Sequence, residues 1–237
     1  MKTEKVYSIN FDFRKREQKR ILEYMQQRGY KLLGFKGAES DGQVAGIPVW
    51  FSVPYIRMAG EVKNVYQSLY KVYYMDASIP SDKSIRMTAL SEVVELGSKV
   101  TMQEDGSFTV EAGGPENAIL FVNNRAADSG KITAGLASLV NGKYAPFCAF
   151  KVDPQQPLRM EPNDKVCLFA LPTIARAGSV AAQILAEGAL FELDTPSNRL
   201  CLEMKQEGGG FNTVCWDMPI KEVRSGEPLT RVMDSDN

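Results

Sequence analysis

The sequence contains no histidine among its 237 residues. Histidine is the usual general base near neutral pH and the commonest metal ligand. Its absence excludes Ser-His-Asp and Cys-His catalysis, histidine-containing zinc sites and the facial iron triad. Carboxylate-pair chemistry, a lysine nucleophile and all-oxygen or all-sulfur metal sites survive this exclusion. The sequence therefore leans away from an enzyme, and it predicts no catalytic residue, no metal site and no cofactor.

Cysteine and long apolar runs are also scarce. The four cysteines, Cys148, Cys167, Cys201 and Cys215, show no CxxC spacing, so a zinc ribbon or a redox motif is unsupported. The N-terminal residues lack the apolar region of a signal peptide, and no run approaches the ~18 apolar residues that a membrane span requires. We expect a cytoplasmic protein with reduced thiols, or one released without a cleaved signal peptide, and no transmembrane segment.

Charge of one sign is not in excess, because 28 basic side chains face 29 acidic ones. A global field that attracts nucleic acid is absent, so nucleic acid is not an expected partner. Residues 14–28 are locally basic, with six basic side chains against Glu17 and Glu23. A patch for nucleic acid or lipid headgroups is one interpretation of this run. A solvated helix face is the favoured one, because charge runs usually serve solvation.

The N-terminal residues predict a strand, a helix and a second strand. Residues 6–13 alternate polar and apolar side chains, which is typical of a half-buried strand. Residues 14–29 are rich in helix formers, carry a narrow apolar stripe and end at Gly29. A strand at 30–36 follows.

Residues 118–171 form apolar runs that are each closed by turn residues, and they predict an antiparallel meander. The pair Asn141-Gly142 suits a two-residue type I′ turn, because both positions need a positive φ. This turn would place Val140 opposite Lys143. The clusters at 153–154 and 161–164 are expected to close the next two strands.

Two more hairpins are predicted. Residues 100–110 form one with a loop that ends at Gly106, and its register places Met102 opposite Phe108. Residues 200–218 form the other around the glycines at 208–210, in a register that places Cys201 opposite Cys215 and Leu200 opposite Trp216.

The remaining segments carry weaker patterns. We expect a loop at 37–46, a strand at 47–53 and a strand at 85–96. Residues 179–193 are predicted as a strand broken by a bulge at Gly188, with a helix as the alternative. The tail, 224–237, is polar and is expected to be extended.

Regularly spaced strands of this kind predict a mainly β fold. The expected architecture is an antiparallel two-layer β-sandwich, of which a jelly roll is one form, with one N-terminal helix at its edge. A single domain over residues 1–237 is the simplest organisation. A strand-helix-strand unit over residues 1–45 is the candidate for a separate lobe.

Aromatic side chains gather in the first third of the chain and provide the candidate ligand-binding residues. Exposed rings would suit a sugar-stacking platform or a belt at a membrane surface. Core packing is the favoured alternative, because strands favour aromatic residues anyway. The candidates are Trp50, Tyr55, Tyr66, Tyr70, Tyr73 and Tyr74.

The leading functional hypothesis is a non-catalytic binding or self-assembly protein that uses surface loops or the aromatic-bearing face. Its expected partners are further copies of itself, as a homo-oligomer, or a glycan or lipid surface. One alternative is a membrane-acting β protein, either pore-forming-like or lectin-like. A further alternative is a hydrolase built on two carboxylates. Architecture alone does not choose among them.

Overall fold

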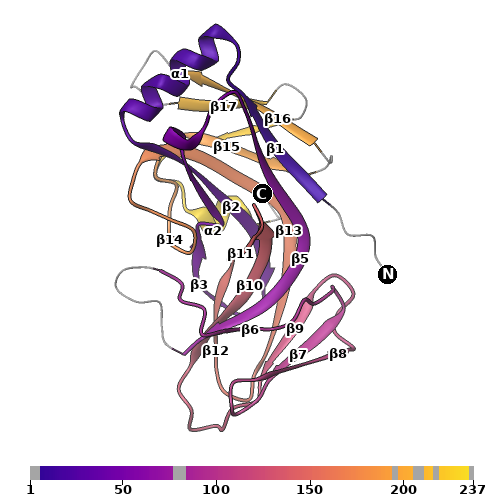
Figure 1. The fold of residues 1–237 in the computed structure, drawn as a ribbon. Helices are drawn as coiled ribbons and strands as arrows, with labels where there is room; N and C mark the ends of the chain where they lie inside the picture. The colour runs from indigo at the N-terminus through magenta and orange to yellow at the C-terminus, as the bar shows by residue number, and fades with distance from the viewer. Residues whose placement is uncertain (1–5, 77–83, 194–196, 205–210, 216–218, 235–237) are drawn as a thin grey trace.

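The computed structural model describes residues 6–76, 84–193, 197–204, 211–215 and 219–234. The chain forms two β-sheets that pack face to face, with the helix α1 (Arg16–Gln27) at one end (Figure 1). This is the mainly β sandwich with one N-terminal helix that the strand pattern predicts. Within the described ranges, no helix is long and apolar enough to cross a membrane.

The first sheet is built around the long strand β5, which runs down much of the molecule (Figure 1). Two of its strands, β11 (Lys143–Pro146) and β6 (Ala89–Leu90), pair only with β10 and β5 respectively. The other strands lie side by side in the order β14 (Val180–Ala181), β3 (Gln43–Pro48), β12 (Ala149–Val152), β10 (Ile132–Val140), β5 (Glu61–Met75), β1 (Val6–Asp12), β16 (Ser197–Met204) and β17 (Phe211–Cys215).

The second sheet is built around β13, the longest strand in the described residues. On one side β13 pairs with β2 (Tyr30–Ser40), which in turn pairs with β4 (Phe51–Pro54), a strand followed by the short helix η1 (Tyr55–Arg57). The remaining strands have the order β18 (Lys221–Val223), β15 (Gly188–Glu192), β13 (Pro157–Pro172), β9 (Ile119–Asn123), β7 (Ser98–Met102) and β8 (Phe108–Ala112).

The second sheet is covered on both faces around β2 and β13. Its inner face packs on the first sheet in the main core, to which Leu32 and Leu168 belong. Its outer face packs in a smaller core under the short helix α2 (Leu229–Met233), together with Leu33 and Phe169. Because successive strand residues point to opposite faces, a strand covered on both sides is buried continuously. The central part of β2, residues 32–37, is such a run.

The local predictions are confirmed. Asn141 and Gly142 have φ values of 49° and 77°, and Val140 pairs with Lys143 across the turn. Met102 pairs with Phe108 in the second hairpin. The strand predicted at 6–13 and the helix predicted at 14–29 correspond to β1 and α1. Each of these features is specified by residues close together in sequence.

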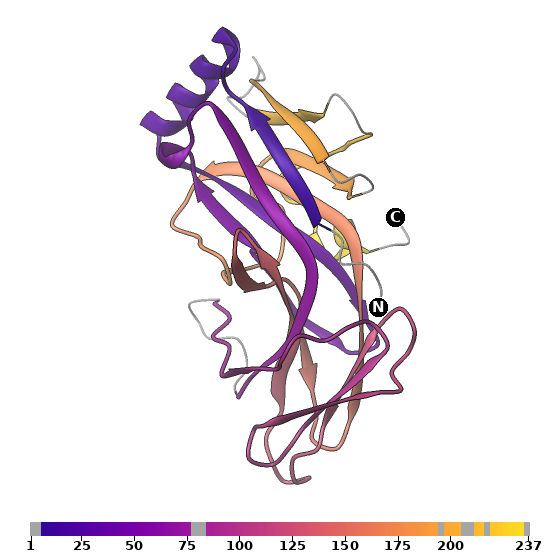
Figure 2. The same cartoon turned by 45° about the vertical axis from the view of Figure 1, so that its right-hand side comes forward.

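The predicted meander over 118–171 is wrong. Strands β9 and β13 belong to the second sheet, whereas β10, β11 and β12 belong to the first (Figures 1 and 2). The residues 161–164 do not end a strand either, because β13 continues through them with a shift of register between Pro162 and Val166. Turn residues within one long strand here produce an irregularity instead of a reversal.

Three weaker predictions need correction. The predicted loop at 37–46 is mostly strand, since β2 runs to Ser40 and β3 begins at Gln43. The predicted strand at 47–53 is divided between the end of β3 and β4. The predicted strand at 85–96 reduces to β6 and single bridges, one of which joins Val94 to Tyr70.

The C-terminal third also differs from expectation. The tail contains α2, whose Leu229 is fully buried, instead of being extended. Residues 179–193 form two short strands, β14 and β15, with Gly188 as the first residue of β15. A Cβ atom on Gly188 would lie 2.1 Å from the carbonyl oxygen of Leu168, so this close pairing requires glycine.

The last hairpin forms, but its predicted register is wrong by one residue. Strand β16 pairs with β17 so that Cys201 lies opposite Val214 and Leu200 lies opposite Cys215. Cys201 and Cys215 are therefore not a directly opposed pair. The predicted environments of Leu200 and Trp216 lie outside the residues whose side chains the structure describes.

Residues 6–45 contribute to both sheets. Strand β1 pairs with β5 and β16 in the first sheet, and β2 pairs with β13 and β4 in the second. Helix α1 connects these two strands and buries Ile21, Leu22 and Met25. The N-terminal unit thus contributes strands to the whole sandwich.

Candidate functional site

The six aromatic candidates all point into the protein. Their exposed fractions lie between 0% and 7% of the maximum. Trp50 donates a hydrogen bond from Nε1 to Ser138 Oγ at 2.9 Å, and its ring meets Tyr66 edge to face at 4.9 Å. This burial fits the packing alternative, and it leaves no exposed platform at Trp50, Tyr55, Tyr66, Tyr70, Tyr73 or Tyr74.

Two of these tyrosines, Tyr66 and Tyr70, lie in the main core between the sheets, whereas strand alternation places Tyr73, which is also buried, on the other face of β5. The hydroxyls of Tyr66 and Tyr70 lie 3.0 Å apart, and the Tyr73 hydroxyl donates to the carbonyl of Cys148 at 2.7 Å. Burial raises the pKa of all three hydroxyls, to about 12 for Tyr70. They are therefore neutral near pH 7 and act as hydrogen-bonding groups within the core.

Lys36 on β2 reaches Tyr66 in this core. Strand alternation places Lys36 on the same side as Leu32, which faces the first sheet. Its side chain is 0% exposed, and its Nζ lies 5.1 Å from the ring centre of Tyr66 and 5.8 Å from that of Phe147. Buried ammonium groups are rare unless they are paired, so the surroundings of Lys36 identify a special position in the fold.

The partners of Lys36 come from the irregular part of β13. Its Nζ donates to the carbonyl of Asn163 and lies 3.6 Å from Oδ1 of Asp164, whose side chain is half exposed. Burial lowers the pKa of Lys36 to about 8, even though Asp164 raises it. The lowered pKa means that desolvation destabilises the charged ammonium group more than the Asp164 carboxylate stabilises it.

Asn163 joins three elements beside Lys36. Its Nδ2 donates to the carbonyl of Met233 in α2 at 3.1 Å, and its Oδ1 accepts from the backbone N–H of Lys165 at 3.1 Å. The Asn163 side chain also lies over Gly37, where a Cβ atom would come within 2.0 Å of Oδ1. The register shift in β13 is thus what brings Asn163 and Asp164 to the lysine.

A cavity of about 260 Å³ opens next to Lys36, where the chain passes from β2 in the second sheet to β3 in the first. Its inner wall is mostly apolar and aromatic, with Phe147, Phe150 and Ile47. Its outer part contains the polar residues Glu39, Ser40, Thr230 and Asp234. Such a combination of apolar walls and a few polar groups is typical of ligand pockets.

Cys148 also lines the cavity, but it is not a reactive thiol. Its Sγ accepts a hydrogen bond from the backbone N–H of Leu136 at 3.3 Å, and the residue is 4% exposed. Burial raises the pKa of the thiol to about 12. Because the thiolate is the nucleophile and the metal ligand, Cys148 at neutral pH is a small apolar wall residue.

The helix α2 forms one side of the cavity through Thr230 and Met233. Besides the Asn163 contact, Lys165 Nζ donates to the carbonyl of Asp234 just after the helix. Sequence patterns did not predict α2, because most residues of the segment 224–237 are polar. The signal for this helix is the spacing of its apolar residues Leu229, Val232 and Met233, which are all buried.

The described residues show no candidate metal site. The described residues contain no group of three or more cysteine and carboxylate side chains placed to hold an ion. Two carboxylates, Glu39 and Asp234, do line the cavity. The hydrolase alternative therefore stays a prediction, with these two residues as its candidates.

Sequence patterns did not single out Lys36. A signal was present, because this lysine stands in the run LLGFKGA, where all its neighbours are apolar or glycine. Comparison of the chain with protein-family models, with curated proteins and with solved structures gives no match. The function is therefore inferred from the residues of the site itself.

Proposed function

We propose that this protein is a non-catalytic binding protein that holds a small molecule in the cavity beside Lys36. The observation that carries the proposal is a buried ammonium group, incompletely compensated by Asp164, at an apolar cavity. Exposed aromatic rings, which motivated the sugar-binding and membrane-acting hypotheses, are not formed by the six candidate residues.

The size of the cavity limits the ligand. Ligand pockets usually measure ~300–1,000 Å³, and an apolar cavity of ~150 Å³ is enough for benzene. A cavity of about 260 Å³ therefore suits one ring or a short chain with a small polar group. The polar group of the ligand should carry an oxygen acceptor, because the ammonium group of Lys36 can only donate hydrogen bonds.

Binding is favoured over carboxylate catalysis by the position of the acidic residues. A hydrolase needs one carboxyl group that keeps its proton near neutral pH, which an apolar environment produces. Asp234 is exposed to solvent, and Glu39 is only partly buried. The cavity wall contributes no activated thiol either, since Cys148 is protonated.

Isothermal titration calorimetry with three probes tests the proposal. Benzoate and benzamide carry an oxygen acceptor on a ring, whereas toluene offers the ring alone. We expect the two acceptor-bearing probes to bind at least ~10-fold more tightly than toluene, which corresponds to about 1.4 kcal/mol for one charge-assisted hydrogen bond. The absence of heat with all three probes at millimolar concentrations would contradict the proposal.

Matched variants locate the binding site. Lys36→Met should remove the preference for probes with an oxygen acceptor, and it roughly preserves the volume of the side chain. Ala38→Leu should narrow the cavity and weaken the binding of all three probes. Lys31→Met is the control, because Lys31 is on the same strand but donates to the carbonyl of Ala175 instead. Binding that survives both Lys36→Met and Ala38→Leu places the site elsewhere.

Covalent capture by Lys36 is the second candidate, and its lowered pKa favours it, since more of the amine is neutral near pH 8. Benzaldehyde with cyanoborohydride distinguishes the two. Reversible binding predicts no enrichment of label at Lys36 over surface lysines such as Lys143. A selective adduct on Lys36 would replace reversible binding with imine chemistry.

A further inference from the structure

A groove of about 350 Å³ with a mixed polar and apolar lining lies beside β8, far from the Lys36 cavity in sequence and sheet order. Val93, Leu96 and Val110 contribute apolar side chains to it, and Val93 is 44% exposed. Glu95 and Glu111 line the same groove and are exposed. Strand β8 is the last strand of its sheet in the described part of the chain.

The groove sits in a strongly acidic region. Residues 91–116 contain six acidic side chains and one basic one, an excess of five negative charges. All six carboxylates are exposed: Glu92, Glu95, Glu104, Asp105, Glu111 and Glu116. The one basic residue, Lys99, is already paired with Glu111 at 2.8 Å.

The sequence segment that contains helix α1 has the opposite charge, although Asp12 and Glu61 pair with its first residue, Arg14, at 2.7 and 3.7 Å. Residues 14–31 contain seven basic and two acidic side chains, an excess of five positive charges. Helix η1 is fixed against α1 by Gln26, whose Nε2 donates to the carbonyls of Tyr55 and Met58 at 3.2 and 2.9 Å. It carries Ile56, which is 70% exposed, so this surface combines cations with an apolar side chain.

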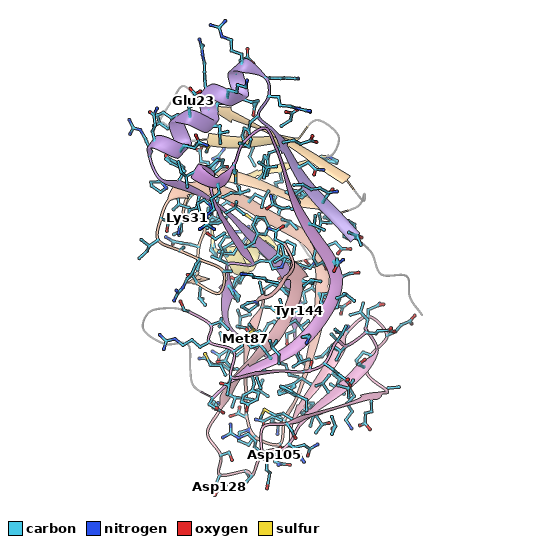
Figure 3. All side chains as sticks on the ribbon, in the orientation of Figure 1. Glu23, Lys31, Met87, Asp105, Asp128 and Tyr144 are labelled. Atoms are coloured by element: carbon cyan, nitrogen blue, oxygen red, sulfur yellow. The ribbon has the colours of Figure 1, made fainter. Side chains whose placement is uncertain are left out.

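Helix α1 and the β7–β8 hairpin lie at opposite ends of the molecule (Figures 1 and 2). The groove lies where Ser98 pairs with Ala112, at the end of this hairpin away from the turn at Asp105. Figure 3 shows Glu23 of α1 at the top and Asp105 of the β7–β8 turn at the bottom, and Figures 1 and 2 place the two elements in the same way. A surface at one end that complements a surface at the other cannot be satisfied within one copy. It is the arrangement expected for a heterologous contact, which gives rings or open filaments.

We infer that the groove beside β8 is the docking site for the α1 end of a second copy of this chain, so that copies associate head to tail. Opposite charges steer the two ends together, and exposed isoleucine and valine side chains supply apolar contact. The contact does not use the Lys36 cavity, and it stands independently of the proposed ligand.

Sedimentation velocity at two salt concentrations tests the inference. The Debye length falls from roughly 20 Å at about 0.02 M salt to roughly 4 Å at about 0.5 M, so association should be strong at low salt and lost at high salt. Lys19→Glu/Arg20→Glu at one end and Glu92→Lys/Glu95→Lys at the other should each weaken association at least ~10-fold. Lys143→Glu/Lys151→Glu, two exposed lysines on β11 and β12, is the matched control and should associate like the wild type.

Mixing the two end variants provides the decisive arm. Each variant keeps one native end, so the mixture should form heterodimers although neither variant associates alone. Circular dichroism confirms that the exposed substitutions leave the fold intact. A wild-type protein that stays monomeric at low salt overturns the inference. Association that changes neither with the salt concentration nor in the charge-reversal variants overturns it as well. Binding to phosphatidylserine vesicles without self-association would also overturn it, because the α1 end would then be a lipid surface.

Discussion

Lys36 is the residue on which the candidate site depends. It is a charged residue in the middle of β2. The residues next to it on this strand alternate between the main core and the smaller core. The protein holds it with a backbone carbonyl and a carboxylate, both provided by the irregular part of β13. A carbonyl and one half-exposed carboxylate compensate a buried ammonium group only in part. The incomplete compensation is what leaves a role for a ligand acceptor.

Because the pKa of Lys36 is lowered in the folded state, we expect the stability of the protein to depend on pH. The folded-state pKa of Lys36, about 8, lies below its ordinary value of 10.5, so between these values the unfolded chain binds more protons than the folded one. Stability contributed by this group therefore rises with pH across that window. Between pH 8 and pH 10, the free energy of unfolding of the wild type should rise by about 2 kcal/mol relative to that of Lys36→Met. The slope should reach up to ~1.4 kcal/mol per pH unit.

Urea unfolding of both proteins across this pH range measures the difference. The tyrosines titrate in both proteins, so the comparison isolates the lysine. Parallel stability curves for the wild type and Lys36→Met would show that the Lys36 pKa is not lowered.

Little of this site could be predicted from sequence patterns. A periodicity of two assigns Lys36 to a strand, but whether its face is covered depends on β5 and on residues 147–150, which are distant in sequence. Asn163 and Asp164 carry the composition of a turn, and only the pairing of β13 with β2 turns them into partners of the lysine. Four of the aromatic candidates lie in β5, namely Tyr66, Tyr70, Tyr73 and Tyr74, whereas Trp50 and Tyr55 lie outside the strands. The burial of all six follows from the packing of distant elements.

Among the elements, the turn at Asn141-Gly142 is the best specified by its own residues. Asn141 Oδ1 accepts from the backbone N–H of Val65 at 2.9 Å, and Asn141 Nδ2 donates to Asn64 Oδ1 at 3.1 Å, so the turn is fixed to β5. Gly142 has a φ of 77°, and a Cβ atom there would meet no atom within 4 Å. Any cost of a side chain at this position is therefore backbone strain alone.

Gly142→Val should destabilise the protein by about 1–3 kcal/mol, the range for a β-branched residue forced to a positive φ. The matched control is Gly130→Val, since Gly130 is exposed, has open space around it and has no positive φ. Chemical denaturation of the two variants gives the comparison. Equal midpoints for Gly142→Val and Gly130→Val would show that the positive φ carries no strain.

The elements that sequence patterns predicted wrongly share a cause. The hairpins at Gly142 and Gly106 form from adjacent residues, and their registers are confirmed. The meander failed because each strand after β9 had a choice between two sheets, and distant strands decide that choice. The tail failed for the same reason, since α2 gains its stability by covering the outer face of the second sheet.

At the scale of the whole molecule, the near-zero net charge conceals a separation of charge. Residues 14–31 and residues 91–116 carry opposite excesses of five charges each, and Figure 3 shows Glu23 of the first segment and Asp105 of the second at opposite ends of the molecule. The Lys36 cavity belongs to neither end, because β2, β3 and α2 form it. The molecule thus offers separate places for a small ligand and for a second copy.

A crystal structure of the protein grown with benzoate tests the central claim most directly. The account predicts density for one benzoate between β2, β3 and α2, with a carboxylate oxygen within hydrogen-bonding distance of Lys36 Nζ and its ring against Phe147 or Phe150. An empty cavity, or benzoate bound only at another surface, would contradict the account.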